Sequence, residues 1–306
     1  MSYILFLLSL VMVIKSAEHS IKYSNALARN LNFSKYVVGF LIVSLISILP
    51  ETFVAIASAI QDNPEFGLGT LVGSNVADLT LIFFIITLFA KKSGIKVNKE
   101  ILSKNLYYLP LLSVPIMFGL NGQFTRLEGL IIFLAGALYF YRSLDKNSFG
   151  IDKRISVKFE FSTLVKLLSS LLVLLVGAYL TVKFGISIAN ELSVPTALIS
   201  IFIVGLGTTL PELFFSIQAI KKNNYSLAIG DLLGTVISDA TIVIGLLAMI
   251  SPFYFDKKII FVTGICMLVG GILLFFFMDS GRKITKTEGL ALLGFYAMTI
   301  LLEIGL

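Results

Sequence analysis

The chain has 306 residues, of which 57% are hydrophobic and only 14% are charged, with a formal charge of +6 at pH 7. Soluble domains carry about 25% charged residues, so this composition excludes an ordinary soluble protein and indicates a polytopic membrane protein. The positive charge does not predict a nucleic-acid partner, because membrane proteins collect lysine and arginine in their cytoplasmic loops.

Ten apolar segments follow one another along the chain, and each predicts a membrane-spanning helix. They lie near residues 2–30, 35–60, 67–90, 103–120, 125–142, 161–189, 196–220, 226–250, 258–278 and 287–304. The first segment lacks the basic start of a signal peptide, so we expect it to be retained as a helix. The predicted class is an all-α polytopic membrane protein with about ten transmembrane helices.

The polar connector Arg142–Lys158 divides the ten segments into five and five. We therefore expect a first five-helix repeat at 1–143, a cytoplasmic linker at 144–158 and a second five-helix repeat at 159–306. Because each half has an odd number of helices, the two halves insert in opposite directions. Such inverted-topology repeats are typical of secondary transporters.

Loop charge predicts the orientation in the membrane. If the helices alternate in direction, one side receives only three basic residues, Arg126, Lys257 and Lys258, and the other receives nearly all the rest. The positive-inside rule puts the basic side in the cytoplasm. The chain is therefore expected in the lipid bilayer of the cell membrane, with both termini outside and the central loop inside.

Two acidic stretches within apolar sequence repeat each other. Leu49-Pro50-Glu51 returns as Leu210-Pro211-Glu212, and each glutamate is followed 27 positions later by an aspartate, Asp78 or Asp239. At a rise of about 1.5 Å per residue, all four acids fall near the middle of a hydrocarbon layer about 30 Å thick. A carboxylate there costs on the order of 2.5–3.5 kcal/mol on insertion scales. The matched placement predicts a cation site at the midplane.

Prolines and hydroxyl groups supply further oxygen atoms. Pro50 and Pro211 have no N–H, so they leave backbone carbonyls one turn earlier without a donor. Broken helices that line a cavity commonly coordinate cations in this way. The predicted metal ligands are Glu51, Glu212, Asp78, Asp239, Ser47, Thr208, Thr209, Ser74 and Thr235. An all-oxygen set suits Ca²⁺, with Na⁺ as a second ion, whereas one cysteine and one histidine are too few for zinc or copper.

The same stretches resemble the alpha repeats of the cation/calcium antiporter superfamily, especially the prokaryotic sodium/calcium exchangers. The alpha-1 motif corresponds to residues 39–80, and the alpha-2 motif corresponds to 200–241. The resemblance implies a Ca²⁺ site of Glu51 and Glu212 with backbone oxygens. It also implies adjacent Na⁺ sites, and a first and a sixth helix that slide as a pair to expose the site to each side in turn.

The chain departs from the family motifs at positions that bear on the coupling ion. Asp78 stands where asparagine is common, and Thr70 and Asp231 replace the asparagines of two Gly-Asn pairs. We expect Asp78 and Asp239 to face each other and to share a proton when no cation separates them. The added carboxylate favours protons, whereas the absence of the Gly-Asn-x-x-Glu motif of calcium/proton exchangers favours Na⁺.

We therefore predict a secondary antiporter, not an enzyme, which functions as a monomer without a cofactor and exchanges Ca²⁺ for Na⁺ by alternating access. A proton-coupled Ca²⁺ or cation exchanger is the alternative. An intramembrane aspartyl protease is a remote alternative, because paired membrane aspartates can share a proton. A channel is another, although it would not need an inverted repeat. The roles of Asp231 and His19 remain open: Asp231 is a candidate for the access path, and His19 is either a helix-packing or interfacial histidine or a proton relay.

Overall fold

A computed structural model describes the fold at residues 2–30, 48–91, 94–98, 102, 107–143 and 161–305. Two predictions lie outside these described residues. One is the first part of the second predicted helix, which contains Ser47. The other is the cytoplasmic linker at 144–158.

The described part of the first half contains five helical stretches, each overlapping one predicted segment. They are α1 (Ser2–Asn30); α4 (Leu49–Ile60); α5 (Pro64–Ala77), continued by the π-helical turn η2 (Asp78–Ile82) and α6 (Phe83–Phe89); α8 (Tyr108–Gly119); and α9 (Arg126–Ser143). The predicted helical class is confirmed in this half.

The second half has the same plan. Its stretches are α10 (Phe161–Leu192); α11 (Thr196–Ile199), η5 (Ser200–Val204), α12 (Gly205–Thr208) and α13 (Leu210–Lys221); α14 (Tyr225–Ile237), η6 (Ser238–Val243) and α15 (Ile244–Ile250); η7 (Ile259–Gly264) and α16 (Ile265–Asp279); and α17 (Lys286–Gly305). Among the described stretches of the whole chain, seven are long and apolar enough to cross a membrane.

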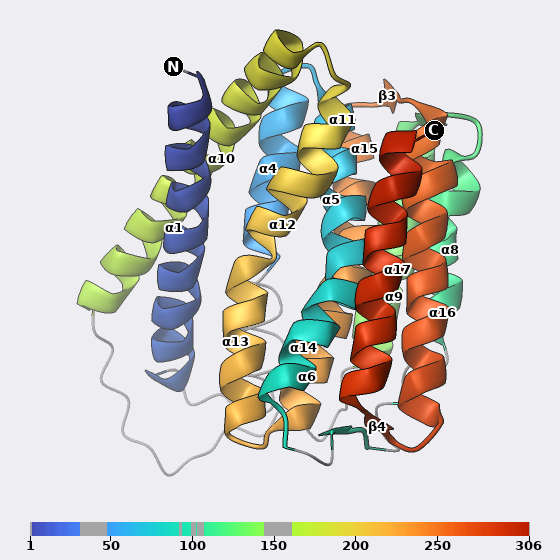
Figure 1. Cartoon of the computed structure of the whole chain (residues 1–306). Helices are drawn as coiled ribbons and strands as arrows, with labels where there is room; N and C mark the ends of the chain where they lie inside the picture. The colour runs from blue at the N-terminus through green and yellow to red at the C-terminus, as the bar shows by residue number, and fades with distance from the viewer. Residues whose placement is uncertain are drawn as a thin grey trace.

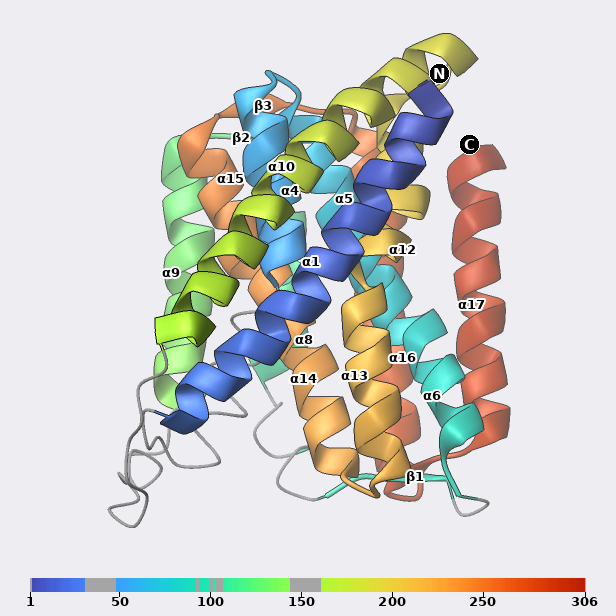
Figure 2. The same cartoon turned by 90° about the vertical axis from the view of Figure 1, so that its left-hand side faces the viewer.

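The helices run side by side, and both termini lie at one end of the bundle, as ten crossings require (Figure 1). Helices α1 and α10 pack against each other and lie obliquely across the remaining helices (Figure 2). An apolar cluster separate from the main core joins this pair to the bundle. It includes Phe6, Val13, Leu174 and Val182 of the pair together with Val54 of α4, Phe66 of α5 and Val204 of η5. The pair therefore forms a layer that packs on the bundle through this cluster.

Two short antiparallel strand pairs join the halves of the chain, and the sequence did not predict them. At one end β1 (Ile95–Lys96) pairs with β4 (Lys283–Ile284), and at the other β2 (Gln123–Phe124) pairs with β3 (Phe253–Tyr254). A glycine with positive φ precedes each first-half strand: Gly94 at +82° and Gly122 at +84°. Each half thus supplies one strand at each end, which is consistent with inverted repeats.

The last helix of each half begins with the same capping box. Glu128 accepts hydrogen bonds from the N–H and hydroxyl of Thr125 at 2.7 and 2.8 Å, before α9. Glu288 accepts the same two from Thr285, both at 2.7 Å, before α17. This reciprocal bonding satisfies N–H groups that a helix start otherwise leaves unpaired.

Glycines let each last helix contact the third helix of the other half. A Cβ added to Gly129 of α9 would lie 2.8 Å from the carbonyl oxygen of Gly245 in α15. A Cβ added to Gly289 of α17 would lie 2.6 Å from the hydroxyl of Thr87 in α6. The two halves are therefore interlocked through corresponding contacts.

Candidate cation site

The predicted glutamates lie in the first turns of two helices, α4 and α13, that each have a proline as their second residue. In the second half, α12 ends at Thr208, and Thr209 separates it from α13, where Pro211 occupies the first turn. In the first half, α4 begins at Leu49 with Pro50 in its first turn. Pro211 cannot donate to the carbonyl of Gly207, which explains the interruption. Glu212 therefore sits beside an interruption of its helix, and Glu51 occupies the corresponding position in the first turn of α4.

The four predicted carboxylates are completely buried. Glu51, Asp78, Glu212 and Asp239 each have 0% of their surface exposed. Within the described part of the chain, seven of their eight oxygen atoms accept no hydrogen bond. The exception is Asp239 Oδ2, which accepts a long bond of 3.5 Å from Ser74 Oγ. Buried charge without partners is costly, so this arrangement needs a compensating cation or proton.

These carboxylates act on one another electrostatically across the two halves. Glu51 interacts with Asp78, Glu212 and Asp239, and Asp78 also interacts with Glu212 and Asp239. The structure thus brings the four acids into one region. In the described residues, however, no three Asp, Glu, His or Cys side chains are arranged to hold a single metal ion. An ion bound here would take its remaining ligands from hydroxyl and backbone oxygens.

The predicted hydroxyl ligands that the structure describes are buried, and two of them lie next to an acid. Thr208 lies beside the Glu51 carboxylate, and Ser74 Oγ lies 3.5 Å from Asp239 Oδ2. Three of these hydroxyls donate to a carbonyl of their own helix, which leaves their oxygen lone pairs available to a cation. The bonds are Ser74 to Leu71 at 3.0 Å, Thr208 to Gly205 at 3.1 Å and Thr209 to Leu206 at 3.0 Å.

A π-helical turn lies at the aspartate of each hairpin, which no sequence pattern indicated. It begins at Asp78 in the first half and at Ser238, one residue before Asp239, in the second. Such turns insert one residue into the helix and are frequent at functional sites. Their occurrence at corresponding positions links them to the orientation of the two aspartates.

Close contact between the halves depends on small residues near Ser74. A Cβ added to Gly73 would lie 2.6 Å from the Cα of Ile201, and one added to Gly205 would lie 2.9 Å from the N atom of Ser74. Backbone atoms cannot yield as side chains can, so these glycines are required for the contact between α5 and the η5–α12 stretch.

Two polar side chains near the aspartates were missed. The Tyr108 hydroxyl of α8 is 0% exposed, accepts or donates no bond within the described residues, and interacts electrostatically with Asp78 and Asp239. Asn75 precedes Asp78 by one helical turn, and its carbonyl oxygen also has no described partner. Asn75 directly follows the predicted ligand Ser74 in the sequence and was overlooked, whereas Tyr108 lies in an apolar run without any signal.

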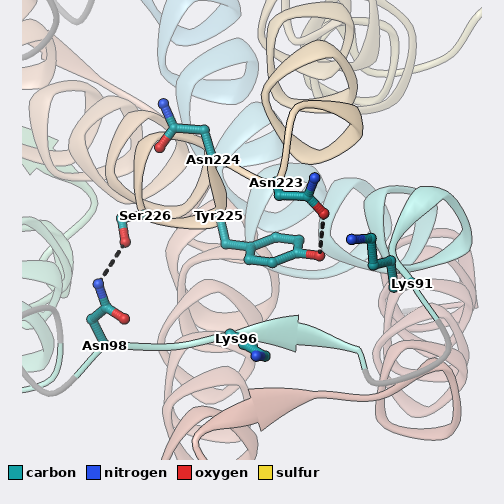
Figure 3. A pocket seen from close by; sticks show the side chains of 7 residues that line it. All are labelled: Lys91, Lys96, Asn98, Asn223, Asn224, Tyr225 and Ser226. Carbon is teal, nitrogen blue, oxygen red and sulfur yellow. Dashed lines mark hydrogen bonds between the residues drawn. The ribbon is translucent and has the colours of Figure 1, made fainter.

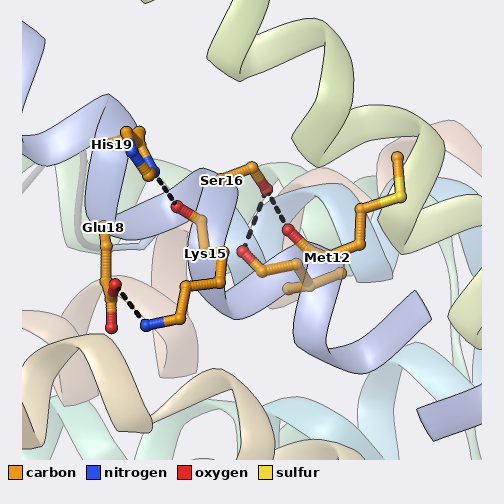
Figure 4. A network of polar contacts seen from close by, with 6 residues as sticks. Met12, Lys15, Ser16, Glu18 and His19 are labelled. Carbon is orange, nitrogen blue, oxygen red and sulfur yellow. Dashed lines mark hydrogen bonds and ion pairs between the residues drawn. The ribbon is translucent and has the colours of Figure 1, made fainter. Parts of the chain in front are cut away.

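The residues of open role lie in different places. Asp231 of α14 is 4% exposed and interacts electrostatically with Asp78 and Glu212, so the second half adds a fifth buried carboxylate. His19 belongs to a local network on α1, where its Nδ1 lies 2.7 Å from the Lys15 carbonyl and Lys15 pairs with Glu18 at 2.9 Å (Figure 4). His19 is exposed and these contacts stay within α1, so they give it no part in the carboxylate site.

The sequence and the fold are both similar to known exchangers. Residues 1–144 and 162–305 match the family described as sodium/calcium exchanger protein. The sodium/calcium exchanger MaX1 of Methanosarcina acetivorans is 24% identical over 96% of this chain and 96% of its own. An uncharacterized membrane protein of Methanocaldococcus jannaschii is 27% identical over 96% of this chain and 95% of its own. The solved structure of the sodium-calcium exchanger NCX_Mj has a similar fold, with a TM-score of 0.69 at 24% identity over 98% of this chain and 97% of that one.

Proposed function

Because the chain belongs to the sodium/calcium exchanger protein family, we propose that it exchanges Ca²⁺ for Na⁺ across the membrane at its buried carboxylates. One observation carries this proposal. Two corresponding hairpins bury four carboxylates in one region, and seven of their eight oxygens have no hydrogen-bond donor in the described part of the chain. Cations supply the missing partners.

The chemistry of the ligands suits both ions. Ca²⁺ takes six to eight oxygen ligands, with flexible geometry, from carboxylates, carbonyls and hydroxyls. Glu51 and Glu212 would hold it together with backbone oxygens near Thr208 and, in the first half, near Ser47. Asp78, Asp239, Ser74, Thr209 and Thr235 would hold Na⁺. Because both ions need the same carboxylate charge, binding of one disfavours the other, and this competition is the basis of exchange.

Alternating access would come from the layer formed by α1 and α10. These helices pack on each other (Figure 2), and the apolar cluster that joins them to α4, α5 and η5 is separate from the main core. A shift of the pair would therefore slide over this cluster and leave the main core packed. Such movement of one unit against a fixed midplane site is the general mechanism of transporters with inverted repeats. A single chain contains all of these parts, so a monomer suffices.

The basic end of the bundle, which carries β1 and β4, would face the cytoplasm, with both termini outside. Cysteine labelling in a Cys266→Ser background tests this orientation. Lys222→Cys, at the end of α13, should react only with reagent on the cytoplasmic side. Lys257→Cys, in the loop after β3, should react only from outside. The reverse pattern would refute the orientation.

A proton-coupled exchanger is the second candidate, and Asp78 is the observation that favours it. The site holds four carboxylates, and Asp231 adds a fifth nearby. This excess of negative charge allows protons to replace some of the Na⁺. The rest of the proposal is unchanged if the coupling ion is H⁺.

Tracer Ca²⁺ uptake into proteoliposomes under separate Na⁺, K⁺ and H⁺ gradients tests the function. An outward Na⁺ gradient should drive uptake, and equal K⁺ should not. If a pH gradient alone drives Ca²⁺ uptake, the coupling ion is H⁺ and not Na⁺. If no gradient drives Ca²⁺ uptake by the folded protein, the proposal is wrong.

A further inference from the structure

A cationic pocket lies at the basic end of the bundle, far along the helices from the buried carboxylates. Its volume is about 390 Å³, within the range of roughly 300–1,000 Å³ that small-molecule sites occupy. Two lysines, three asparagines, a tyrosine and a serine line it; they are Lys91, Lys96, Asn98, Asn223, Asn224, Tyr225 and Ser226. Among the residues that the structure describes, the lining contains no carboxylate and no aliphatic side chain.

Both halves of the chain form the pocket (Figure 3). Lys91 follows α6, Lys96 belongs to β1, and the other wall is the turn between α13 and α14. The walls are joined by a hydrogen bond of 3.0 Å from Asn98 Nδ2 to Ser226 Oγ. On the second wall, the Tyr225 hydroxyl donates to Asn223 Oδ1 at 3.3 Å. The amide groups of Asn98 and Asn223 are thus held in place near the lysines.

The positive charge of this pocket is not compensated within the described residues. Lys91 and Lys96 form no ion pair there, and Lys96 lies directly opposite Lys283 in the β1–β4 pair. Like charges at opposing positions of an antiparallel pair destabilise it. Nearby, the ammonium of Lys221 lies 5.1 Å from the ring centre of Phe89, and among the described residues it pairs with no acid. The positive-inside rule explains lysines at this end, but it does not explain a cavity that combines them with amides.

We propose that this pocket binds a phosphate-bearing anion. Lysine ammonium groups, asparagine N–H donors and hydroxyls are the groups that bind phosphate oxygens. Basic pockets between membrane helices on the cytoplasmic side commonly take lipid headgroups, and a free phosphate offers the same chemistry. A bound anion would relieve the repulsion between Lys96 and Lys283, and it would join α6 and β1 to the α13–α14 turn.

Thermal unfolding of the purified chain, free of Ca²⁺, tests the proposal with two probes. The first is inorganic phosphate against chloride in a neutral detergent, as potassium salts at equal ionic strength. The second is phosphatidate in nanodiscs of phosphatidylcholine. A ligand that binds only the folded state raises the Tm in proportion to its occupancy. At least one probe should raise the Tm of the parent protein.

The double variant Lys91→Gln/Lys96→Gln should bind that probe about tenfold or more weakly, because two charged partners are lost. The control variant Lys222→Gln/Lys286→Gln removes the same charge near the same end, outside the pocket lining, and should respond like the parent. A response to phosphate alone identifies a soluble anion, and a response to phosphatidate alone identifies a lipid headgroup.

Equal Tm responses of the parent and the pocket variant to both probes would overturn the proposal, as would no response of the parent to either. If the double variant does not fold, the exposed Lys91→Gln change alone carries the comparison. Loss of the response in the control variant as well would show only general attraction to the basic end, and would also overturn the proposal.

Discussion

The hairpin of α4 and α5 and the hairpin of α13 and α14 share one plan but have different surroundings. In both, a glutamate follows a proline and a π-helical turn lies at the aspartate. In the first, Gly73 is pressed against the backbone of Ile201. In the second, a Cβ added to Gly230 would meet no described atom within 4 Å. The common plan brings the acids together, whereas the local packing differs: Gly73 lies in close contact with a backbone and Gly230 does not.

Polar residues differ between the hairpins as well. Thr70 of α5 donates to the carbonyl of Phe66 at 3.0 Å and is satisfied within its own helix. Its counterpart Asp231 carries a charge that acts on Glu212 and Asp78. The two halves are therefore symmetric in the elements that hold cations and asymmetric around them. Four sets of substitutions test how far this symmetry extends.

The largest effect is expected at the glutamates. Glu51→Gln and Glu212→Gln should each lower tracer Ca²⁺ uptake by about a hundredfold or more, because each removes a buried charge on which the ion depends. Thermal unfolding should be unimpaired, since a buried carboxylate is itself costly. The control Glu65→Gln, at the start of α5, should transport normally. Undiminished uptake in both site variants would show that these glutamates do not bind the transported ion. Loss of uptake in only one variant would show that the two hairpins contribute unequally.

Replacing a glycine by alanine should change the stability of the protein differently in the two hairpins. Alanine in place of glycine stabilises the helix by about 1 kcal/mol at either position, because alanine has the higher helix propensity. Gly73→Ala also forces a methyl group into the Ile201 backbone, and overpacking of this kind costs about 1–3 kcal/mol. Unfolding measurements should therefore show Gly73→Ala destabilised and Gly230→Ala unchanged or stabilised. Equal effects of the two variants would contradict the difference in packing.

Asp78 tests whether protons bind the site. A carboxylate pair that shares a proton must lose it when a cation binds, so acid should inhibit Ca²⁺ flux. Asp78→Asn breaks the pair, and the inhibition should move to lower pH by about one unit. Flux against pH should be unchanged in the control Asp62→Asn, which alters an exposed loop carboxylate. Superimposable profiles of the parent and Asp78→Asn would end the case for proton involvement.

The smallest effect is expected at the capping boxes. Thr125→Ala and Thr285→Ala should each destabilise the fold by about 1 kcal/mol, because each leaves helix N–H groups without an acceptor. Thr287→Ala, one residue into α17 from its start, is the control and should have little effect. Since the hydrogen bonds of the two boxes have nearly the same lengths, unequal losses would show that the halves do not depend equally on their last helices.

The fold was largely predictable because hydrocarbon imposes strong rules on the sequence. Apolar length defines helices, and the 27-residue spacing from Glu51 to Asp78 and from Glu212 to Asp239 identified the repeat. The four acids predicted from that spacing do lie in one region. Thr209, between α12 and α13, marks the break that Pro211 predicted.

Other features depend on contacts between distant residues and left no local signal. The strand pair of Lys96 with Lys283 needs both halves in place, and two-residue strands have no periodicity. The π-helical turn at Asp78 is similar in composition to the α-helix around it. Tyr108 joins the aspartates only through the packing of α8 against η6. Ser47 lies outside the described residues, so its role is still a prediction.

The two strand pairs also show how the halves of the chain depend on each other. Neither half is a closed fold, because β1 and β2 find their partners only in β4 and β3. The molecule is in this sense a dimer within one polypeptide, with mutual contacts at both ends. Folding then includes an association step, and the covalent link makes that step unimolecular by raising the effective concentration of each half for the other.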